Sequence, residues 1–308
     1  QAVEDAILDL LGKLPPGKSV SPEDVAKAVD AAGWRRELGK VRPVAVGLAR
    51  AGRLTILRHN KPADPDRFRG VWRRSLLRTP ESSDTDTTVR WLQTSRWHAD
   101  IRVPAGRPDF SGVSSLAACS PAQLQWLTTQ QGFAGVTRVD PQNDDTGWLR
   151  LVDFQPPAAL PDEGHAAFRD GMLVETGIHA DYLEHWHRVP GSDDGFAVFR
   201  QCDGGRPAWL MVAGHCVIHV RPRVTAFDEQ GWSAGLGQLD ALRMQLDFEI
   251  SFGERALQGW VIRHSTLPWR EGRSLTVTQR EHQMGEITLV IDGEASRWTV
   301  LEWTPPGT

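Results

Sequence analysis

The stretch VRWLQTSRWHADIRV, residues 89–103, decides the fold class because polar and apolar side chains alternate along much of it. In an extended strand, successive side chains project from opposite faces. We therefore predict a long β-strand with one face in a core. One face would carry Trp91, Gln93, Ser95, Trp97, Ala99 and Ile101, and the other Arg90, Leu92, Thr94, Arg96, His98, Asp100 and Arg102.

The same period of two dominates the chain from Val89 onward. Most of the twelve candidate strands are separated by Gly, Pro, Asp or Asn, which favours antiparallel barrels or sandwiches. One helix interrupts them, opened by Ser120-Pro121 and ended before Gly132, and a second helical turn is expected near 236–242. The candidate strands are 89–103, 147–154, 171–176, 182–188, 196–202, 207–213, 216–224, 243–252, 257–264, 273–280, 285–292 and 296–303.

Composition and charge divide the chain into modules. The 308 residues are 40% apolar and 24% charged, as in an ordinary globular protein. Residues 1–78 hold 16 Lys+Arg and 9 Asp+Glu, a net charge of +7, whereas the remainder has a net charge of −11. Because residues 79–88 lack large apolar side chains, we expect an acidic linker there, between a front module (1–78) and a back module (89–308, divided near 203).

The front module has the pattern of three helices and a hairpin. Apolar residues at helical spacing run from 3 to 14, Ser21-Pro22 is typical of a capped helix start, and a third helix is expected over about 34–51, with Pro43 as a kink or its true start. Residues 54–57 and 70–73 would form the hairpin. The segments 16–19, 21–26, 33–35, 51–54 and 61–65 resemble a small bacterial winged-helix family of uncharacterised function.

That resemblance implies nucleic-acid binding, in which basic side chains meet phosphates. Winged helices also serve as protein-docking modules, and the arginines would then be a solvated face. The candidate nucleic-acid-binding residues are Arg35, Arg36, Lys40, Arg42, Arg50 and Arg53.

The back module carries a second resemblance. The segments Trp91–Thr94, Asp100–Pro104, Gln131–Gly135, Trp148 and Asp153–Pro157 are similar to the lipocalin-like family named after a yeast casein-kinase-interacting protein. This implies two small calycin barrels packed side by side, with no firmly assigned chemical activity. The expected fold class is thus mainly β with an α-rich N-terminal module: a winged helix followed by lipocalin-like antiparallel β-barrels.

The polar face of the opening stretch has two interpretations. Turned into a barrel, its charged row could bind a ligand; turned to water, it would leave the tryptophans to fill the core, and we favour this second interpretation. Many Trp residues could also line a cavity. The candidate ligand-binding residues are His98, Asp100, Arg102, Trp97, Trp186 and His215.

Residues 175–188 concentrate three His, two Glu and one Asp. His185 and His187 would share a strand face, and with His179 and Glu184 they are the candidate acid–base catalysts. His215 and His219 would share a face in another strand. No sequence signature fixes a metal, whose presence stays unknown, and no nucleotide or haem-attachment motif is present, so no cofactor is expected.

The sequence therefore predicts a small-molecule-binding protein with a partly apolar or aromatic ligand inside a barrel, coupled to a basic module that docks nucleic acid or protein. The alternative is a cofactor-independent acid–base enzyme, a lyase, isomerase or hydrolase. With three scattered cysteines, no leader pattern and no long apolar run, we expect a cytoplasmic protein without membrane contact.

Overall fold

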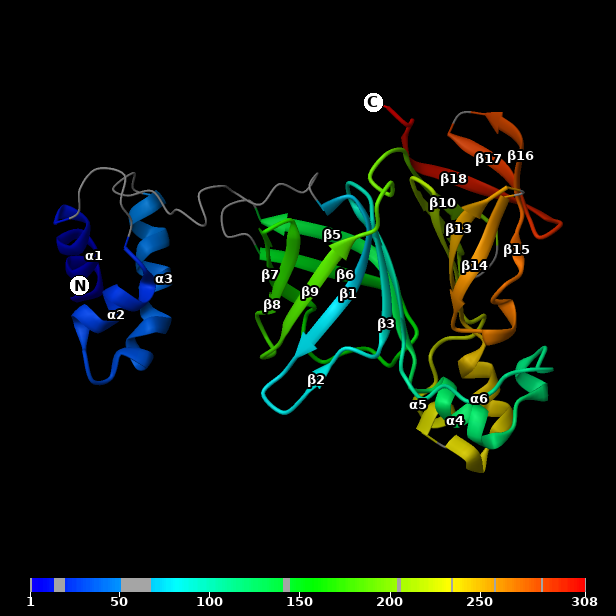
Figure 1. Cartoon of the computed structure of the whole chain (residues 1–308), viewed down its shortest axis with the longest axis horizontal. Helices are drawn as coiled ribbons and strands as arrows, with labels where there is room; N and C mark the ends of the chain where they lie inside the picture. Colours follow the sequence, from blue (N-terminus) through cyan, green and yellow to red (C-terminus); the bar gives the residue numbers. More distant parts are fainter. Residues whose placement is uncertain are drawn as a thin grey trace. The chain divides into compact units, whose positions relative to one another are not determined.

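The computed structural model describes residues 2–13, 20–50, 68–140, 145–203, 206–233, 235–257, 259–283 and 285–307 (Figure 1). The chain divides into two compact units, residues 1–62 and 63–308. Each unit is built around its own apolar clusters.

The N-terminal unit contains three helices, α1 (Ala2–Gly12), α2 (Pro22–Val29) and α3 (Trp34–Arg50). A capping box starts α2, because the Ser21 side chain accepts from the Asp24 backbone N–H and the Asp24 side chain accepts in return. Pro43 lies inside α3, which continues through it. Apolar side chains of all three helices form one core, with Val3, Ile7, Val25, Ala26, Val41 and Leu48 buried. The predicted strand at 54–57 lies outside the described residues.

The first strand of the second unit, β1 (Gly70–Arg78), corrects the predicted module boundary at residue 78. It pairs with both β3 and β9 and so closes the first barrel, where the sequence had suggested a wing strand. Trp72 is fully buried inside that barrel, and Val71 is fully buried in the core that its outer face shares with the second barrel. The neighbouring arginines made the stretch resemble a basic wing. The predicted linker 79–88 is the loop of a hairpin and includes β2 (Ser83–Asp84), which pairs back onto β1.

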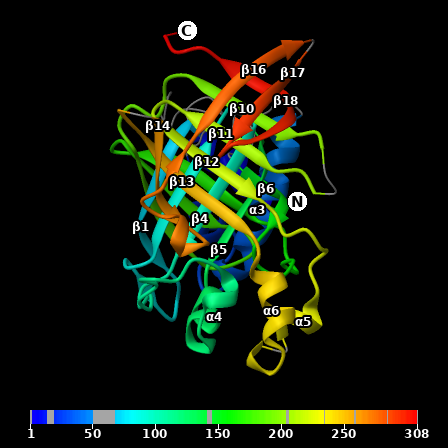
Figure 2. The same cartoon turned by 90° about the vertical axis from the view of Figure 1, so that its right-hand side faces the viewer.

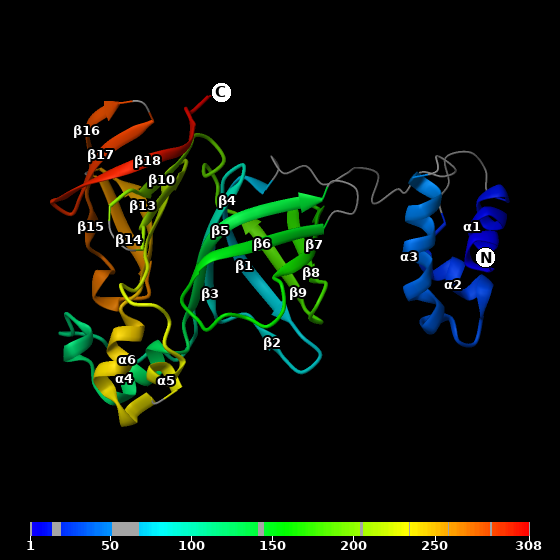
Figure 3. The ribbon, with the colours of Figure 1, turned by 180° about the vertical axis from the view of Figure 1, so that it is seen from behind.

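Eight antiparallel strands form the closed first barrel, because β1 pairs at one side with β3 and at the other with β9 (Figure 3). The strands follow one another in chain order, and most connections between neighbours are short; the exception is the segment between β4 and β5, which contains a helix. Besides β1 they are β3 (Thr88–Gln93), β4 (Trp97–Val103), β5 (Gln131–Asp140), β6 (Asp145–Asp153), β7 (Glu163–Arg169), β8 (Met172–Gly177) and β9 (Leu183–Arg188).

The single strand predicted at 89–103 is a hairpin. The backbone N–H of Thr94 donates to Trp97 O (2.9 Å), and the Trp97 N–H donates to Thr94 Oγ1 (3.1 Å), which reverses the chain at residues 94–96. Because of this turn, the inward-facing residues have odd numbers before it and even numbers after it. Trp91 therefore lies opposite Asp100 in the ladder, and both side chains face the barrel interior.

The second sheet curls into a nearly closed barrel, whose edge strands β15 and β16 follow each other in the chain (Figure 1). Its strand order is β15-β14-β13-β12-β11-β10-β18-β17-β16. The bounds are β10 (Phe196–Gln201), β11 (Trp209–Ala213), β12 (Cys216–Arg221), β13 (Glu249–Ala256), β14 (Gly259–Ser265), β15 (Ser274–Leu275), β16 (Val277–Gln283), β17 (Glu286–Ile291) and β18 (Glu294–Thr304).

Three short helices gather near one end of the barrels: α4 (Pro121–Leu127), α5 (Glu229–Ser233) and α6 (Leu239–Leu246) (Figures 1 and 2). The helix α6 replaces the start of the strand predicted at 243–252. Leu239, Leu242 and Leu246 recur at helical spacing, and the last two are buried. The strand begins only at Glu249.

The outer faces of the two barrels share a large apolar core, which includes Ala99 and Ile101 from β4 and Ile218 and Val220 from β12. Trp97 packs against Trp209 there, with ring centroids 5.1 Å apart. Hydrogen bonds also cross the same interface. The buried Arg223 side chain donates to the carbonyls of Asp153 (3.2 Å), Phe154 (2.7 Å) and Gln245 (2.8 Å).

Candidate functional site

The polar row of β4 faces the interior of the first barrel, which corrects the interpretation that it faces water. His98 and Asp100 are 0% and 1% exposed. Arg102 Nε donates to Asp100 Oδ2 (2.7 Å), and its guanidinium lies 3.5 Å from Glu184 on β9. Glu184 also accepts from Arg74 Nη1 (3.0 Å). Each buried charge thus has a partner, as burial requires.

Glu175 lies directly opposite Glu184 on the neighbouring strand, inside the same barrel. The Tyr182 hydroxyl donates to Glu175 Oε1 (2.8 Å). Burial, followed by the charge of Glu184, raises the pKa of Glu175 to about 8. This carboxyl group is therefore protonated at neutral pH.

His98 is held as a neutral imidazole. The Thr137 hydroxyl donates to Gln93 Oε1 (2.8 Å), so it accepts from His98 Nδ1 (3.0 Å). Burial and the nearby Arg150 lower the pKa of His98 to about 3. An imidazole with so low a pKa stays neutral near pH 7 and does not act as a base there.

Aromatic rings fill most of the remaining space in the first barrel. Trp91 packs against Trp186 and Trp148 with ring centroids 5.3 and 5.9 Å apart. The void left between these rings and Asp100, Arg102 and Glu175 measures about 20 Å³. That volume suits about one water molecule. The interior candidates His98, Asp100, Arg102 and Trp186 thus surround a nearly filled space.

The candidate catalytic residues do not converge. Glu184 points inward, whereas His185 and His187 alternate to the outer face of β9. His187 Nε2 lies 3.1 Å from Ser75 Oγ, and His179 sits in the loop before β9, 2.7 Å from Glu163. The structure places these three imidazoles outside the barrel, apart from the buried carboxylates.

The two remaining ligand-binding candidates also lie elsewhere. Trp97 belongs to the core between the barrels. His215 lies in the turn between β11 and β12 and donates through Nδ1 to Gly191 O (3.1 Å), so it does not share a strand face with His219. His219, together with Val217, faces the interior of the second barrel.

The second barrel has a cavity of about 490 Å³ at one end. Its apolar walls come from the barrel and from the segment between β4 and α4, which reaches over from the first barrel. That segment is anchored where Arg107 Nη1 donates to Glu271 (2.8 Å) and where Leu116 O accepts from Arg243 Nε (3.2 Å). The apolar lining includes Leu116, Leu267, Trp269, Ile291 and Trp298.

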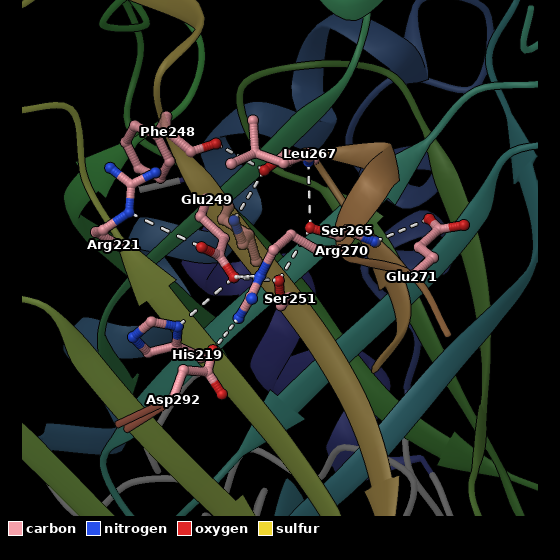
Figure 4. Close-up of polar contacts among 12 residues, drawn as sticks. His219, Arg221, Phe248, Glu249, Ser251, Ser265, Leu267, Arg270, Glu271 and Asp292 are labelled. Carbon is pink, nitrogen blue, oxygen red and sulfur yellow. Dashed lines mark hydrogen bonds and ion pairs between the residues drawn. The ribbon is translucent and has the colours of Figure 1, made fainter. Parts of the chain in front are cut away.

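A polar cluster on β12, β13 and the turn after β14 forms one wall of this cavity (Figure 4). Glu249 Oε1 accepts from Ser251 Oγ (2.7 Å) and Arg270 Nε (3.0 Å). Arg270 Nη2 donates to Asp292 Oδ2 (2.5 Å), and Arg221 Nη2 donates to Asp247 Oδ1 (2.8 Å). Although burial favours the neutral form, His219, Arg270 and Ser251 hold the pKa of Glu249 well below its usual range.

His219 is the least satisfied member of the cluster. Its side chain is 9% exposed, and Nδ1 lies 3.7 Å from Glu249 Oε1, too far for a hydrogen bond. Within the described residues this nitrogen has no hydrogen-bond partner. A buried polar atom of this kind leaves a contact for a ligand or a water molecule to make.

Sequence reasoning missed Glu249 and Arg270. The signal available was the alternation Glu249, Ile250, Ser251, Phe252, which is typical of a strand with one polar face. Among the described residues, no three His, Cys, Asp or Glu side chains gather as a metal site requires. No helix in the described part of the chain has both the length and the apolar character to span a bilayer.

Comparisons with known proteins give one family match over part of the chain and one structural likeness, and neither assigns an activity. Residues 1–77 match a family described as "Protein of unknown function (DUF3253)". The structure resembles the crystal structure of the uncharacterized protein YLR301w from Saccharomyces cerevisiae, with a TM-score of 0.52, at 12% identity, over 76% of this chain and 98% of that one. No curated protein matches the sequence.

The yeast likeness shows a shared fold, mainly β with two closed or nearly closed barrels, which is compatible with ligand binding. Neither comparison names a winged helix or the casein-kinase-related lipocalin-like family. Those two resemblances therefore stay predictions.

Proposed function

We propose that this protein binds a small molecule in the cavity at the end of the second barrel. The observation that carries the proposal is the cavity of about 490 Å³ at the end of the second barrel, whereas the void among the rings inside the first barrel measures about 20 Å³. Small-molecule sites usually enclose several hundred Å³, with apolar walls and a few placed polar groups. The second cavity matches that description.

The placement of the polar groups favours binding over catalysis. The acid–base alternative rests on His179, His185 and His187, and these lie on the outside of the first barrel, apart from its buried carboxylates. In the second cavity, Glu249 is held by three neighbours and lacks the raised pKa of a general acid. The cluster is suited to orienting a ligand.

The N-terminal unit completes the proposal as a docking module for nucleic acid or protein. Its support is the exposure of Arg35, Arg36 and Lys40 on α3. The side chains of Arg42 and Arg50, and the whole of Arg53, lie outside the described residues. Retention of the full chain on duplex DNA at low salt, weakened by Arg35→Ala with Arg36→Ala, would support nucleic acid; unchanged retention would favour protein docking.

The ligand proposal is tested with N-phenyl-1-naphthylamine, a neutral fluorescent probe of apolar cavities. Ser115 is exposed and lies on the cavity rim, where its side chain makes no capping bond. A Ser115→Trp variant should therefore block the mouth without unfolding the chain. Ala117→Trp adds the same bulk to an exposed residue of the same segment that does not line the cavity.

We expect saturable probe binding to the wild-type protein and to Ala117→Trp, and a loss of about tenfold or more in affinity for Ser115→Trp. Equal binding to all three proteins would mean that the probe sits elsewhere. Absence of binding to the wild-type protein would also refute the proposal.

A further inference from the structure

We infer that the ligand of the second-barrel cavity is an organic cation, an amine with an apolar body; this rests on the proposed function above. The cavity is lined by four carboxylates and two guanidinium groups. Two of the walls are indole rings, Trp269 and Trp298. The argument depends on which of these charges are already neutralised.

Both guanidinium groups are occupied by protein carboxylates. Arg270 bridges Glu249 and Asp292, at 3.0 and 2.5 Å. Arg221 contacts Asp247 at 2.8 Å and lies 3.8 Å from Glu249. An anionic ligand would have to compete with these carboxylates for the same donors. The cavity therefore lacks a ready anion site.

The negative charge, in contrast, is in excess. Asp247, Glu249 and Asp292 share two arginines, and Glu294, at the start of β18, stands outside these ion pairs while lining the same cavity. With four negative and two positive side chains, the lining carries a net charge of −2 when His219 is neutral. In a partly enclosed space such an excess attracts a cation.

His219 supplies a second, independent indication. Its side chain is nine-tenths buried, and Nδ1 faces Glu249 at 3.7 Å without a hydrogen bond. When His219 is neutral, the carboxylate of Glu249 favours the tautomer with the proton on Nδ1, which leaves Nε2 as an acceptor. An acceptor beside excess carboxylates suits the N–H donors of an ammonium group.

The rest of the lining defines the body of the ligand. Leu116, Leu267 and Ile291 are apolar, and the indole rings attract both apolar groups and cations through their faces. A compact amine that carries an aromatic or branched aliphatic group would use both kinds of wall. A free metal cation would leave the apolar walls without contacts.

The test is displacement of N-phenyl-1-naphthylamine at pH 7 by two competitors of matched size, phenethylamine and 3-phenylpropionate. We expect phenethylamine to displace the probe at a concentration about tenfold lower than 3-phenylpropionate requires. The difference should narrow at high salt, because part of it is electrostatic. Equal displacement, or preference for 3-phenylpropionate, would overturn the inference while the bound probe still supports the cavity as a ligand site.

Two charge variants localise the effect. Glu294→Gln removes the carboxylate that stands outside the ion pairs of the described residues, and it should weaken phenethylamine binding about two- to fivefold while leaving 3-phenylpropionate binding unchanged or stronger. Glu286→Gln removes a negative charge from the neighbouring strand outside the cavity and should change neither competitor. Equal effects of the two variants would overturn the inference. Failure of the probe to bind the wild-type protein would overturn the proposed function, and this inference with it.

Discussion

Glu175 makes the stability of the first barrel depend on pH in an unusual direction. Its pKa rises from 4.5 to about 8 on folding, because burial and the opposite carboxylate of Glu184 disfavour its charge. Between these two pH values the folded protein keeps a proton that the unfolded chain has released. Stability therefore falls as pH rises through this window. At about 1.4 kcal/mol per pKa unit, the full interval corresponds to an upper limit of about 5 kcal/mol.

Glu175→Gln removes this penalty and keeps an oxygen that accepts from Tyr182. We expect the variant to match the wild-type protein within about 1 kcal/mol at pH 5 and to exceed its free energy of unfolding by about 2 to 4 kcal/mol at pH 9. Urea unfolding at pH 5, 7 and 9 measures the difference. Glu81→Gln, at an exposed position in the loop after β1, is the control and should leave the pH profile unchanged. A Glu175→Gln effect that is the same at pH 5 and pH 9 would refute the assigned pKa.

Three further outcomes are expected. Arg223→Met leaves the carbonyls of Asp153, Phe154 and Gln245 without their donor and should lower the free energy of unfolding by about 2 to 4 kcal/mol in urea, whereas Arg206→Met should change it by under about 1 kcal/mol. The NMR signals of the His98 ring should stay at neutral-imidazole positions down to pH 5, since its pKa is lowered to about 3; titration near pH 6.5 would contradict the buried row. Gly135→Ala places a Cβ against Leu149 O at the β5–β6 register shift and should lower the melting temperature by several degrees, while an unchanged value would argue against this register.

Local patterns predicted much of the fold. Period-two alternation indicated antiparallel barrels from residue 89 onward, and the Ser-Pro pairs at Ser21 and Ser120 marked the starts of α2 and α4. The three N-terminal helices also follow from apolar spacing. These features depend on neighbours in sequence, so the sequence displays them directly.

The errors arise where distant contacts decide. The turn at Thr94 places the polar residues of β4 on the interior face of the barrel. The sequence pattern of this short turn cannot be distinguished from that of a continuous strand. β1 resembled a basic wing because its partner β9 lies more than a hundred residues away. The cavity could not be predicted from the sequence for the same reason, since its lining residues Glu249, Arg270 and Leu116 come from three separate segments.

The account depends on the second barrel, not the first, receiving the ligand. Histidine-labelled protein titrated with N-phenyl-1-naphthylamine tests this most directly by NMR, because His219 faces the second cavity and His98 lies inside the first barrel. The predicted result is a saturable shift of the His219 ring signals with those of His98 unmoved. A shift of His98 alone, or of neither ring while the probe binds, would contradict it.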